Sequence, residues 1–164
     1  MADQPRALYP GTFDPPTLGH LDLIRRGVDL FGPLLVAVAN NNTKKPLFTA
    51  EERIAMIQAE VGDLPVTVEY FRGLVVEHAR ERGISVILRG VRTVSDFEYE
   101  YQMAMTNRTL EPKIETAFVM PSEKYSYLSS RLIKEVYASG GELRRFLPEA
   151  VHDQLIERLS QTAS

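Results

Sequence analysis

Short apolar runs alternate along the chain with longer segments in which apolar residues recur every three or four positions. The short runs are rich in Val, Ile, Leu and aromatic residues, and most lack an alternation of polar residues, which is typical of strands covered on both faces. They predict strands at Ala7–Tyr9, Leu34–Ala39, Val66–Phe71, Ser85–Leu88 and Glu115–Met120.

The longer segments predict helices at Gly19–Leu30, from Thr49 onward, and at Leu74–Arg82, Ser95–Thr109, Ser130–Ser139 and Glu149–Leu159. The sequence from Thr49 to Glu52 is a capping box, and Gly83 suits the residue after a helix end. In the helix at 95–109, an apolar face is predicted to hold Val94, Phe97, Tyr101, Ala104 and Met105.

The regular alternation of strands and helices predicts an α/β fold: one doubly wound, Rossmann-like domain over residues 1–164, with a parallel sheet and no linker or repeat. The helix after Pro148 is interpreted as a C-terminal appendage that covers the sheet or an oligomer partner. In such sheets ligands bind beyond the carboxyl ends of the strands. The loops at 10–18, 40–48, 89–94 and 121–128 are therefore predicted to meet at the ligand-binding edge.

Charge and composition narrow the possible functions. Against 22 Asp and Glu the chain has 19 Lys and Arg, a net charge of −3, so no overall field favours nucleic acid or an anionic membrane. An anionic ligand must then be bound by local cations and backbone N–H groups. The absence of cysteine excludes disulfides, thiolate metal sites and a cysteine nucleophile. The longest apolar run, Leu34–Ala39, is too short for a membrane span, and no signal-peptide pattern is seen, so a cytoplasmic location is expected.

The loop after the first strand, YPGTFDPPTLGH, is dense in proline and glycine and ends at a helix start. It contains neither a dinucleotide fingerprint nor a Walker loop. Gly19 allows close approach of a ligand, free N–H groups at a helix start suit a phosphate, and His20 can donate to the same phosphate. The alternative is that His20 is only a solvated or capping residue. A helix N-terminus disfavours its imidazolium form, whereas a bound triphosphate favours that form and is expected to outweigh the helix once ATP is bound; either form can donate one N–H to the α-phosphate.

Further candidates lie in the other loops at this edge. Arg89 and Arg92 flank Gly90 and Val91 and can hold a polyphosphate from two sides, unless they are plain surface arginines. Lys44 and Lys45 follow the second strand, although a lysine pair is usually solvated.

Two helices add polar candidates. One stripe of the helix at 95–109 either lines the cleft or is solvated surface; it consists of Asp96, Glu100, Met103 and Asn107. Ser129 and Ser130 are ordinary N-cap residues that can also form a second phosphate-binding helix start. His78 and His152 are predicted to be surface residues, and the histidines lack the spacing of a zinc site.

These motifs together resemble a known family. The segment from Thr17 to His20 resembles the T/HxGH signature of nucleotidyltransferases related to class I aminoacyl-tRNA synthetases. With KKPLFTAEER, LRGVRTVSDFEYEYQMAMTNR and SSRLIKEVYASGG, the chain from about Arg6 to Leu159 resembles phosphopantetheine adenylyltransferases, which act in coenzyme A synthesis.

The resemblance implies a five-stranded sheet in the order 3-2-1-4-5, and transfer of adenylyl from ATP to 4′-phosphopantetheine with Mg²⁺ in a homohexamer. It implies catalytic roles for His20, Lys44 and Arg92, with Mg²⁺ bound mainly by ATP phosphates. The ATP-binding residues implied are Thr12, Phe13, Gly19, His20, Gly90, Val91, Arg92, Asp96, Glu100, Tyr125, Ser126, Tyr127, Leu128, Ser129, Ser130 and Arg131. The phosphopantetheine-binding residues implied are Thr12, Lys44, Leu74, Val75, Arg89, Met103 and Asn107.

The chain departs from the family pattern at one site. The family usually has three serines in the last motif, whereas this chain has Arg131 after Ser129 and Ser130. Arg131 can supply a charge-assisted contact in place of the third hydroxyl. Tyr125 stands where the family often has Trp, which is a milder change.

Alternative functions remain open at this point. Another nucleotidyltransferase, acting on nicotinamide mononucleotide or transferring cytidylyl, fits the first loop and helix, although the KKPLFT and DFEYE blocks disfavour it. A non-catalytic adenine-nucleotide sensor could use the same cleft. A dehydrogenase is disfavoured by the absence of GxGxxG.

Overall fold

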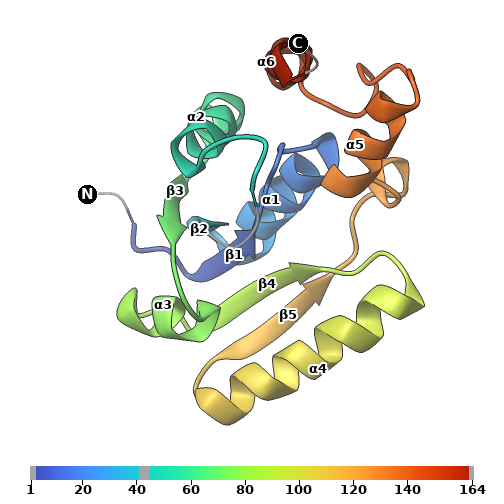
Figure 1. Ribbon diagram of the computed structural model, residues 1–164. Helices are drawn as coiled ribbons and strands as arrows, with labels where there is room; N and C mark the ends of the chain where they lie inside the picture. The colour runs from blue at the N-terminus through green and yellow to red at the C-terminus, as the bar shows by residue number, and fades with distance from the viewer. Residues whose placement is uncertain (1–2, 41–44, 163–164) are drawn as a thin grey trace.

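The computed structural model describes residues 3–40 and 45–162 and has a five-stranded sheet in the order β3-β2-β1-β4-β5 (Figure 1). All neighbouring strands pair in parallel, so the predicted fold class and strand order are confirmed. The strands are β1 Ala7–Gly11, β2 Leu34–Ala39, β3 Val66–Phe71, β4 Val86–Gly90 and β5 Glu115–Val119. The helices are α1 Leu18–Phe31, α2 Ala50–Val61, α3 Val75–Glu81, α4 Val94–Leu110, α5 Ser130–Ala138 and α6 Glu149–Thr162, with the short 3₁₀ helix η1 Glu123–Tyr125, which was not predicted.

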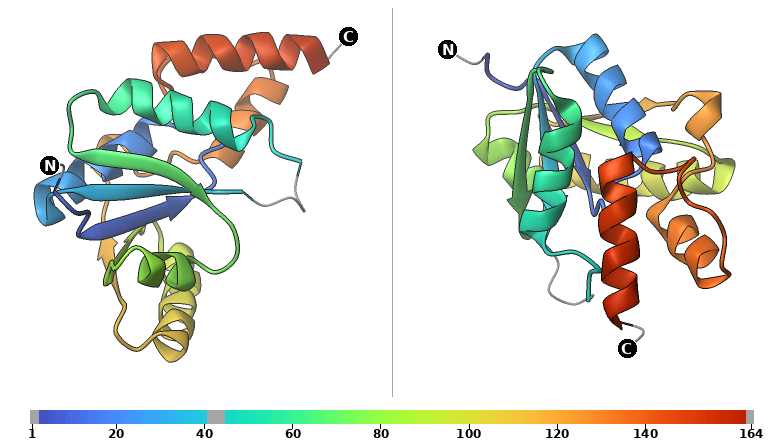
Figure 2. Two further views of the ribbon diagram at one scale, coloured as in Figure 1. Left: turned by 90° about the vertical axis from the view of Figure 1, so that its left-hand side faces the viewer. Right: turned by 90° about the horizontal axis from the view of Figure 1, so that it is seen from above.

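Helices cover both faces of the sheet, with α2 on one side and α3 and α4 on the other in Figure 2. Successive side chains of β1 point to opposite faces, as in any strand. Ala7 and Tyr9 belong to a core cluster with residues of α1 and α2, whereas Leu8 belongs to a second cluster with Val76 and Ala79 of α3. Burial on both faces explains why the strand sequences lack polar alternation.

Strand β4 extends two residues beyond the predicted end at Leu88. Arg89 and Gly90 are paired with Phe118 and Val119 of β5, so they lie in the sheet and not in the loop. The strand ends where its pairing with the neighbouring parallel strand ends. The sequence of β4 alone does not contain this information. The Arg89 side chain consequently starts from a fixed backbone position at the carboxyl edge of the sheet.

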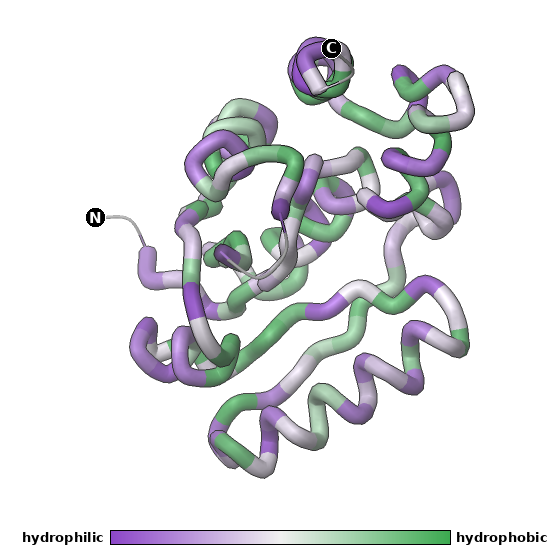
Figure 3. Tube along the Cα trace, viewed as in Figure 1, coloured by the Kyte–Doolittle hydropathy of each residue, from purple (hydrophilic) through white to green (hydrophobic). Residues whose placement is uncertain are grey.

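Of the predicted apolar face of α4, only Ala104 is buried within this chain. Val94, Phe97 and Tyr101 are 79%, 45% and 50% exposed, whereas Glu100 and Asn107 are buried. Helix α4 runs below β4 and β5 in Figure 1, and hydrophilic and hydrophobic segments follow one another along its whole length in Figure 3. The buried face of the helix includes Glu100, which forms an ion pair with Arg89 of β4, a contact that apolar periodicity does not report.

Helix α6 does not cover the sheet. It packs with α2 and α5 around a third core cluster that contains Phe48, Ile133, Val151 and Leu155 (Figure 2). His152 of α6 and His78 of α3 are buried, contrary to the surface position predicted for both. Each imidazole lies beside carboxylates, which allows a polar ring to be buried in these otherwise charged helices.

Candidate active site

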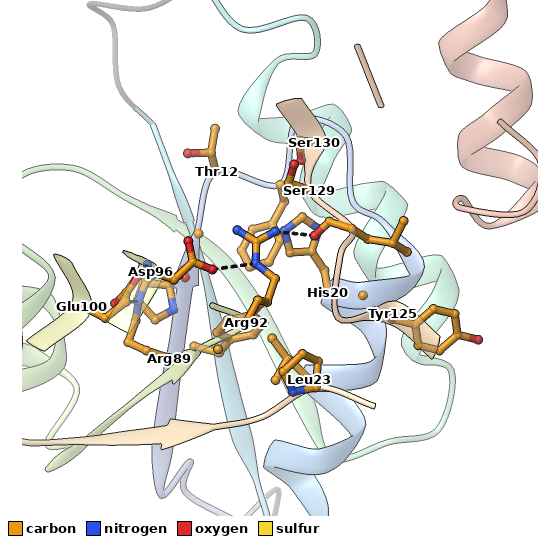
Figure 4. A pocket seen from close by; sticks show the side chains of 18 residues that line it. Thr12, His20, Leu23, Arg89, Arg92, Asp96, Glu100, Tyr125, Ser129 and Ser130 are labelled. Carbon is orange, nitrogen blue, oxygen red and sulfur yellow. Dashed lines mark hydrogen bonds and ion pairs between the residues drawn. The ribbon is translucent and has the colours of Figure 1, made fainter. Parts of the chain in front are cut away.

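A cavity of about 270 Å³ opens beyond the carboxyl ends of β1 and β4, where the strand order reverses. We call it the α1 cavity because it is bordered by the first turn of α1 (Figure 4). Its lining is Tyr9, Pro10, Gly11, Thr12, Phe13, Gly19, His20, Leu23, Arg89, Gly90, Arg92, Asp96, Glu100, Pro121, Tyr125, Leu128, Ser129 and Ser130. Three of the predicted ligand-edge loops therefore meet at one site.

His20 has a fixed orientation and tautomer. Thr17 is the N-cap of α1, and its side-chain oxygen accepts a hydrogen bond from the backbone N–H of His20 at 3.3 Å. In return, the Thr17 backbone N–H donates to Nδ1 of His20 at 3.0 Å. Histidine thus takes the place of the usual Glu or Gln in a capping box. Because Nδ1 accepts, the neutral ring carries its proton on Nε2, the nitrogen left for a ligand.

Burial, followed by the charges of Arg92 and Arg89, lowers the pKa of His20 to about 4. The imidazole is therefore neutral at pH 7. The sequence suggested that the helix terminus would oppose protonation, and the surrounding arginines act in the same direction.

The lowered pKa predicts a dependence of stability on pH. Unfolded His20 takes up a proton near its ordinary pKa of 6.5, while folded His20 does not until about pH 4. Below pH 6.5 the unfolded state then binds more protons, so stability falls as the pH decreases through this window. We expect the wild type to lose on the order of 2 kcal/mol more than His20→Gln between pH 7 and pH 5. Glutamine retains a capping side chain without titrating.

Urea titrations of the two proteins at several pH values measure this difference. Carboxylate titrations are shared by both proteins and cancel in the comparison. If the unfolding free energies of the two proteins change in parallel between pH 7 and pH 5, the pKa of His20 is not lowered in the folded state.

The two arginines predicted to bind phosphate occupy different environments. The guanidinium of Arg92 donates to Asp96 at 3.1 Å and to the backbone oxygen of Leu128 (Figure 4). Arg89 forms a two-bond ion pair with Glu100 at 2.6 and 2.8 Å and donates to the oxygen of Pro10 at 3.0 Å. Burial disfavours the charged form of Arg89, but hydrogen bonds and charge from Glu100 outweigh it and raise the pKa of Arg89.

A second cavity, of about 350 Å³, lies beside the first, and we call it the α4 cavity. Its lining is Pro10, Gly11, Thr12, Ala39, Phe71, Val75, Ile87, Arg89, Tyr99, Glu100, Met103, Ala104, Asn107 and Thr116. Thr12, Arg89 and Glu100 line both cavities, so a cation lies between a mostly apolar pocket and a polar one. Such a pair of pockets suits two ligands whose anionic ends meet.

Most predicted site residues come together in these cavities, but several do not. Val91, Ser126, Tyr127, Arg131 and Leu74 line neither one. The Tyr127 ring lies edge-on to Phe146 and is 57% exposed. The Arg131 side chain is 89% exposed and pairs with Glu135, so in this structure it does not replace the third serine hydroxyl. Lys44 lies outside the described residues.

The sequence reasoning missed several lining residues. Phe71 ends β3 at the ligand edge and forms part of the α4 cavity, and its place at a strand end could have indicated this. Tyr99 and Thr116 also line that cavity, but only the orientation of α4 against β5 brings them there. Leu23 reaches the α1 cavity from the second turn of α1.

Within residues 3–40 and 45–162, no group of three or more His, Cys, Asp or Glu side chains could bind a metal ion. Over the same residues, no helix is long and apolar enough to cross a membrane. The charged side chains that line the cavities form two ion pairs, Arg89 with Glu100 and Arg92 with Asp96.

Comparison with known proteins agrees with this geometry. Residues 8–136 match the cytidylyltransferase-like family. A phosphopantetheine adenylyltransferase of Caldanaerobacter subterraneus subsp. tengcongensis is 50% identical over 157 residues, covering 95% of this chain and 98% of the relative. One from Solidesulfovibrio magneticus is 50% identical over 153 residues, covering 93% and 89%.

A solved structure supports the fold alone. The structure of a putative nicotinate-nucleotide adenylyltransferase from Vibrio parahaemolyticus superposes with a TM-score of 0.64 at 14% identity, covering 92% of this chain and 91% of that one. The identity and coverage of the curated relatives are decisive: this chain belongs to the family of phosphopantetheine adenylyltransferases.

Proposed function

We propose that this protein transfers the adenylyl group of ATP to 4′-phosphopantetheine, giving dephospho-coenzyme A and pyrophosphate. The observation that carries the proposal is the junction of the two cavities at Thr12 and Arg89. The α1 cavity, with His20 and Arg92, suits a triphosphate. The α4 cavity, with Val75 and Met103, suits the pantetheine arm.

The proposed reaction is a single displacement. A phosphate oxygen of the acceptor attacks the α-phosphorus of ATP. The bond between this phosphorus and the oxygen that links it to the β-phosphate breaks, and pyrophosphate leaves with that oxygen. The acceptor oxygen is already anionic at neutral pH, so no general base is required. Catalysis then depends on positioning and on cationic or N–H donors around the α-phosphate.

The protein residues have distinct roles in this proposal. Neutral His20 donates Nε2–H to the α-phosphate, Arg92 and Lys44 stabilise the developing charge, and Arg89 holds the acceptor phosphate. The start of α5 at Ser129 and Ser130 offers further N–H donors. Mg²⁺, held by phosphate oxygens of ATP rather than by a protein cage, would neutralise charge on the leaving group. A cytoplasmic location remains a prediction.

Substrate choice tests the function. Purified protein is incubated with ATP, Mg²⁺ and either 4′-phosphopantetheine or nicotinamide mononucleotide, and pyrophosphate release is measured. We expect release with phosphopantetheine only. Release with nicotinamide mononucleotide alone would assign the chain to another reaction, and ATP binding without release would favour a nucleotide sensor.

We also propose that the protein is a homohexamer, as the resemblance implies. Its support here is an apolar surface on α4 and β5, where the Phe97 and Phe118 rings lie 5.7 Å apart and are 45% and 36% exposed. The neighbouring Val94 and Met120 are 79% and 77% exposed. Exposed apolar patches of this kind often mark contacts between subunits.

Replacing Phe97 by Glu is expected to shift the hexamer toward smaller species, because a charge would be buried at the contact. Sedimentation velocity of the wild type and the variant measures this shift, with Leu30→Glu as a control at another exposed apolar residue, on α1. A monomeric wild type, or an unchanged distribution for Phe97→Glu, would contradict the proposal.

A further inference from the structure

The carboxylate of Asp14 links three separate parts of the chain. It lies in the loop between β1 and α1 and is only 3% exposed. Its oxygens accept hydrogen bonds from the backbone N–H groups of Leu47 at 2.8 Å and Phe48 at 2.9 Å, in the segment before α2. Nζ of Lys134, in α5, donates to it at 3.0 Å. One buried charge thus joins residues that are 33 to 120 positions apart in the sequence.

The residues next to Asp14 are held by contacts of the same kind. The Thr12 oxygen accepts from the buried Arg53 at 2.6 Å, and the Pro15 oxygen accepts from the Ser130 hydroxyl at 2.9 Å. Thr12 and Ser130 both line the α1 cavity, although Asp14 and Lys134 do not. Asp14 and Lys134 line a neighbouring cavity together with Thr12 and Arg53, so Asp14 lies behind two walls of the α1 cavity and not inside it.

We infer that Asp14 and Lys134 are positioning residues for adenylyl transfer. Their ion pair sets the distance between the first turn of α1, which carries His20, and the first turn of α5, which carries Ser130. The two turns face the same cavity, and a triphosphate held between them requires both at the correct separation. The inference rests on the proposed function, and it concerns residues outside the set expected to touch substrate.

The exposure of the two partners makes the inference testable. The Lys134 side chain is 44% exposed, while that of Asp14 is 4% exposed. Removing the lysine leaves Asp14 with its two backbone donors, so the protein is expected to fold. Asp14→Asn, by contrast, leaves an amide facing two N–H donors and can prevent folding.

The primary test uses Lys134→Met and Lys134→Arg, assayed by pyrophosphate release with ATP and 4′-phosphopantetheine. Lys134→Met is expected to lower kcat about 10-fold with less than a threefold change in KM for ATP, because a small misplacement affects the transition state most. Lys134→Arg retains the charge at Asp14 and is expected to restore kcat to within about threefold of the wild type. Thermal melts of the same samples show whether any loss follows the unfolded fraction.

The matched control is Arg82→Met. Arg82 is 53% exposed and pairs with Glu69 at 2.7 Å, and neither residue lines the α1 or the α4 cavity. This variant also loses an ion pair whose cation is about half exposed, and its kcat is expected to equal that of the wild type.

The possible outcomes separate the inference from the function on which it rests. An inactive wild type would refute the proposed function, and this inference with it. With an active wild type, the inference alone fails if Lys134→Met matches Arg82→Met in kcat, or if Lys134→Arg is as impaired as Lys134→Met. It also fails if the lost activity equals the unfolded fraction.

Discussion

Replacement of His20 by alanine is expected to lower kcat by about 100-fold or more, while KM for ATP changes much less. The Nε2–H of His20 is a donor whose direction is set by the Thr17 cap, and removal of one fixed donor at a developing oxyanion typically costs this much. The triphosphate retains Arg92 and the helix N-termini, so ground-state binding is less affected. Steady-state kinetics of pyrophosphate release measure both constants.

His152→Gln is the matched control for His20→Ala. His152 is a buried imidazole that lies in α6 beside Asp153 and lines neither cavity. We expect its kcat to stay near that of the wild type. Equal turnover by His20→Ala and the wild type would remove His20 from the mechanism.

Replacement of Arg89 by methionine is the second large effect that we expect. The change removes the proposed donor to the acceptor phosphate, which predicts a loss of about 100-fold in kcat/KM for phosphopantetheine, near the upper value for a charged hydrogen bond. It also leaves the buried Glu100 carboxylate without its partner. Because Arg89 is about a third exposed, we expect a cost of about 2–3 kcal/mol in unfolding free energy, below that of a fully buried pair.

A double variant separates these two consequences. In Arg89→Met with Glu100→Gln, the unpaired carboxylate is gone, so stability in urea should largely recover. The kcat/KM for phosphopantetheine should stay low, because the cation is still absent. Recovery of both quantities together would show that Arg89 acts only by neutralising Glu100.

The loop YPGTFDPPTLGH shows how far the sequence could predict the site. Its proline and glycine content and its place after the first strand were sufficient to predict a ligand-binding loop with Gly19 and His20 at a helix start. Capping by His20 was considered only as an alternative to a binding role, and its reciprocal contact with Thr17 was not predicted, because the usual pattern has Glu or Gln at that position. The motif thus indicated the residue, and the backbone contacts determine its tautomer.

Helix α4 shows where prediction from periodicity fails. Its apolar residues have helical spacing, yet the buried positions are Glu100, Ala104 and Asn107. The helix packs through an ion pair with Arg89 and leaves Phe97 and Tyr101 exposed. The sequence pattern identifies the most apolar face of a helix. That face need not be the buried one when the helix also makes a charged contact with a strand that is distant in the sequence.

The central claim is that both substrates meet at the junction of the two cavities and react directly. Its most direct test is the stereochemical course at the α-phosphorus, followed by phosphorus NMR of the product from a single diastereomer of adenosine 5′-O-(1-thiotriphosphate). A single in-line displacement predicts inversion of configuration in the thio analogue of dephospho-coenzyme A. Retention would require two displacements and an adenylyl-enzyme intermediate, and it would contradict the proposed mechanism.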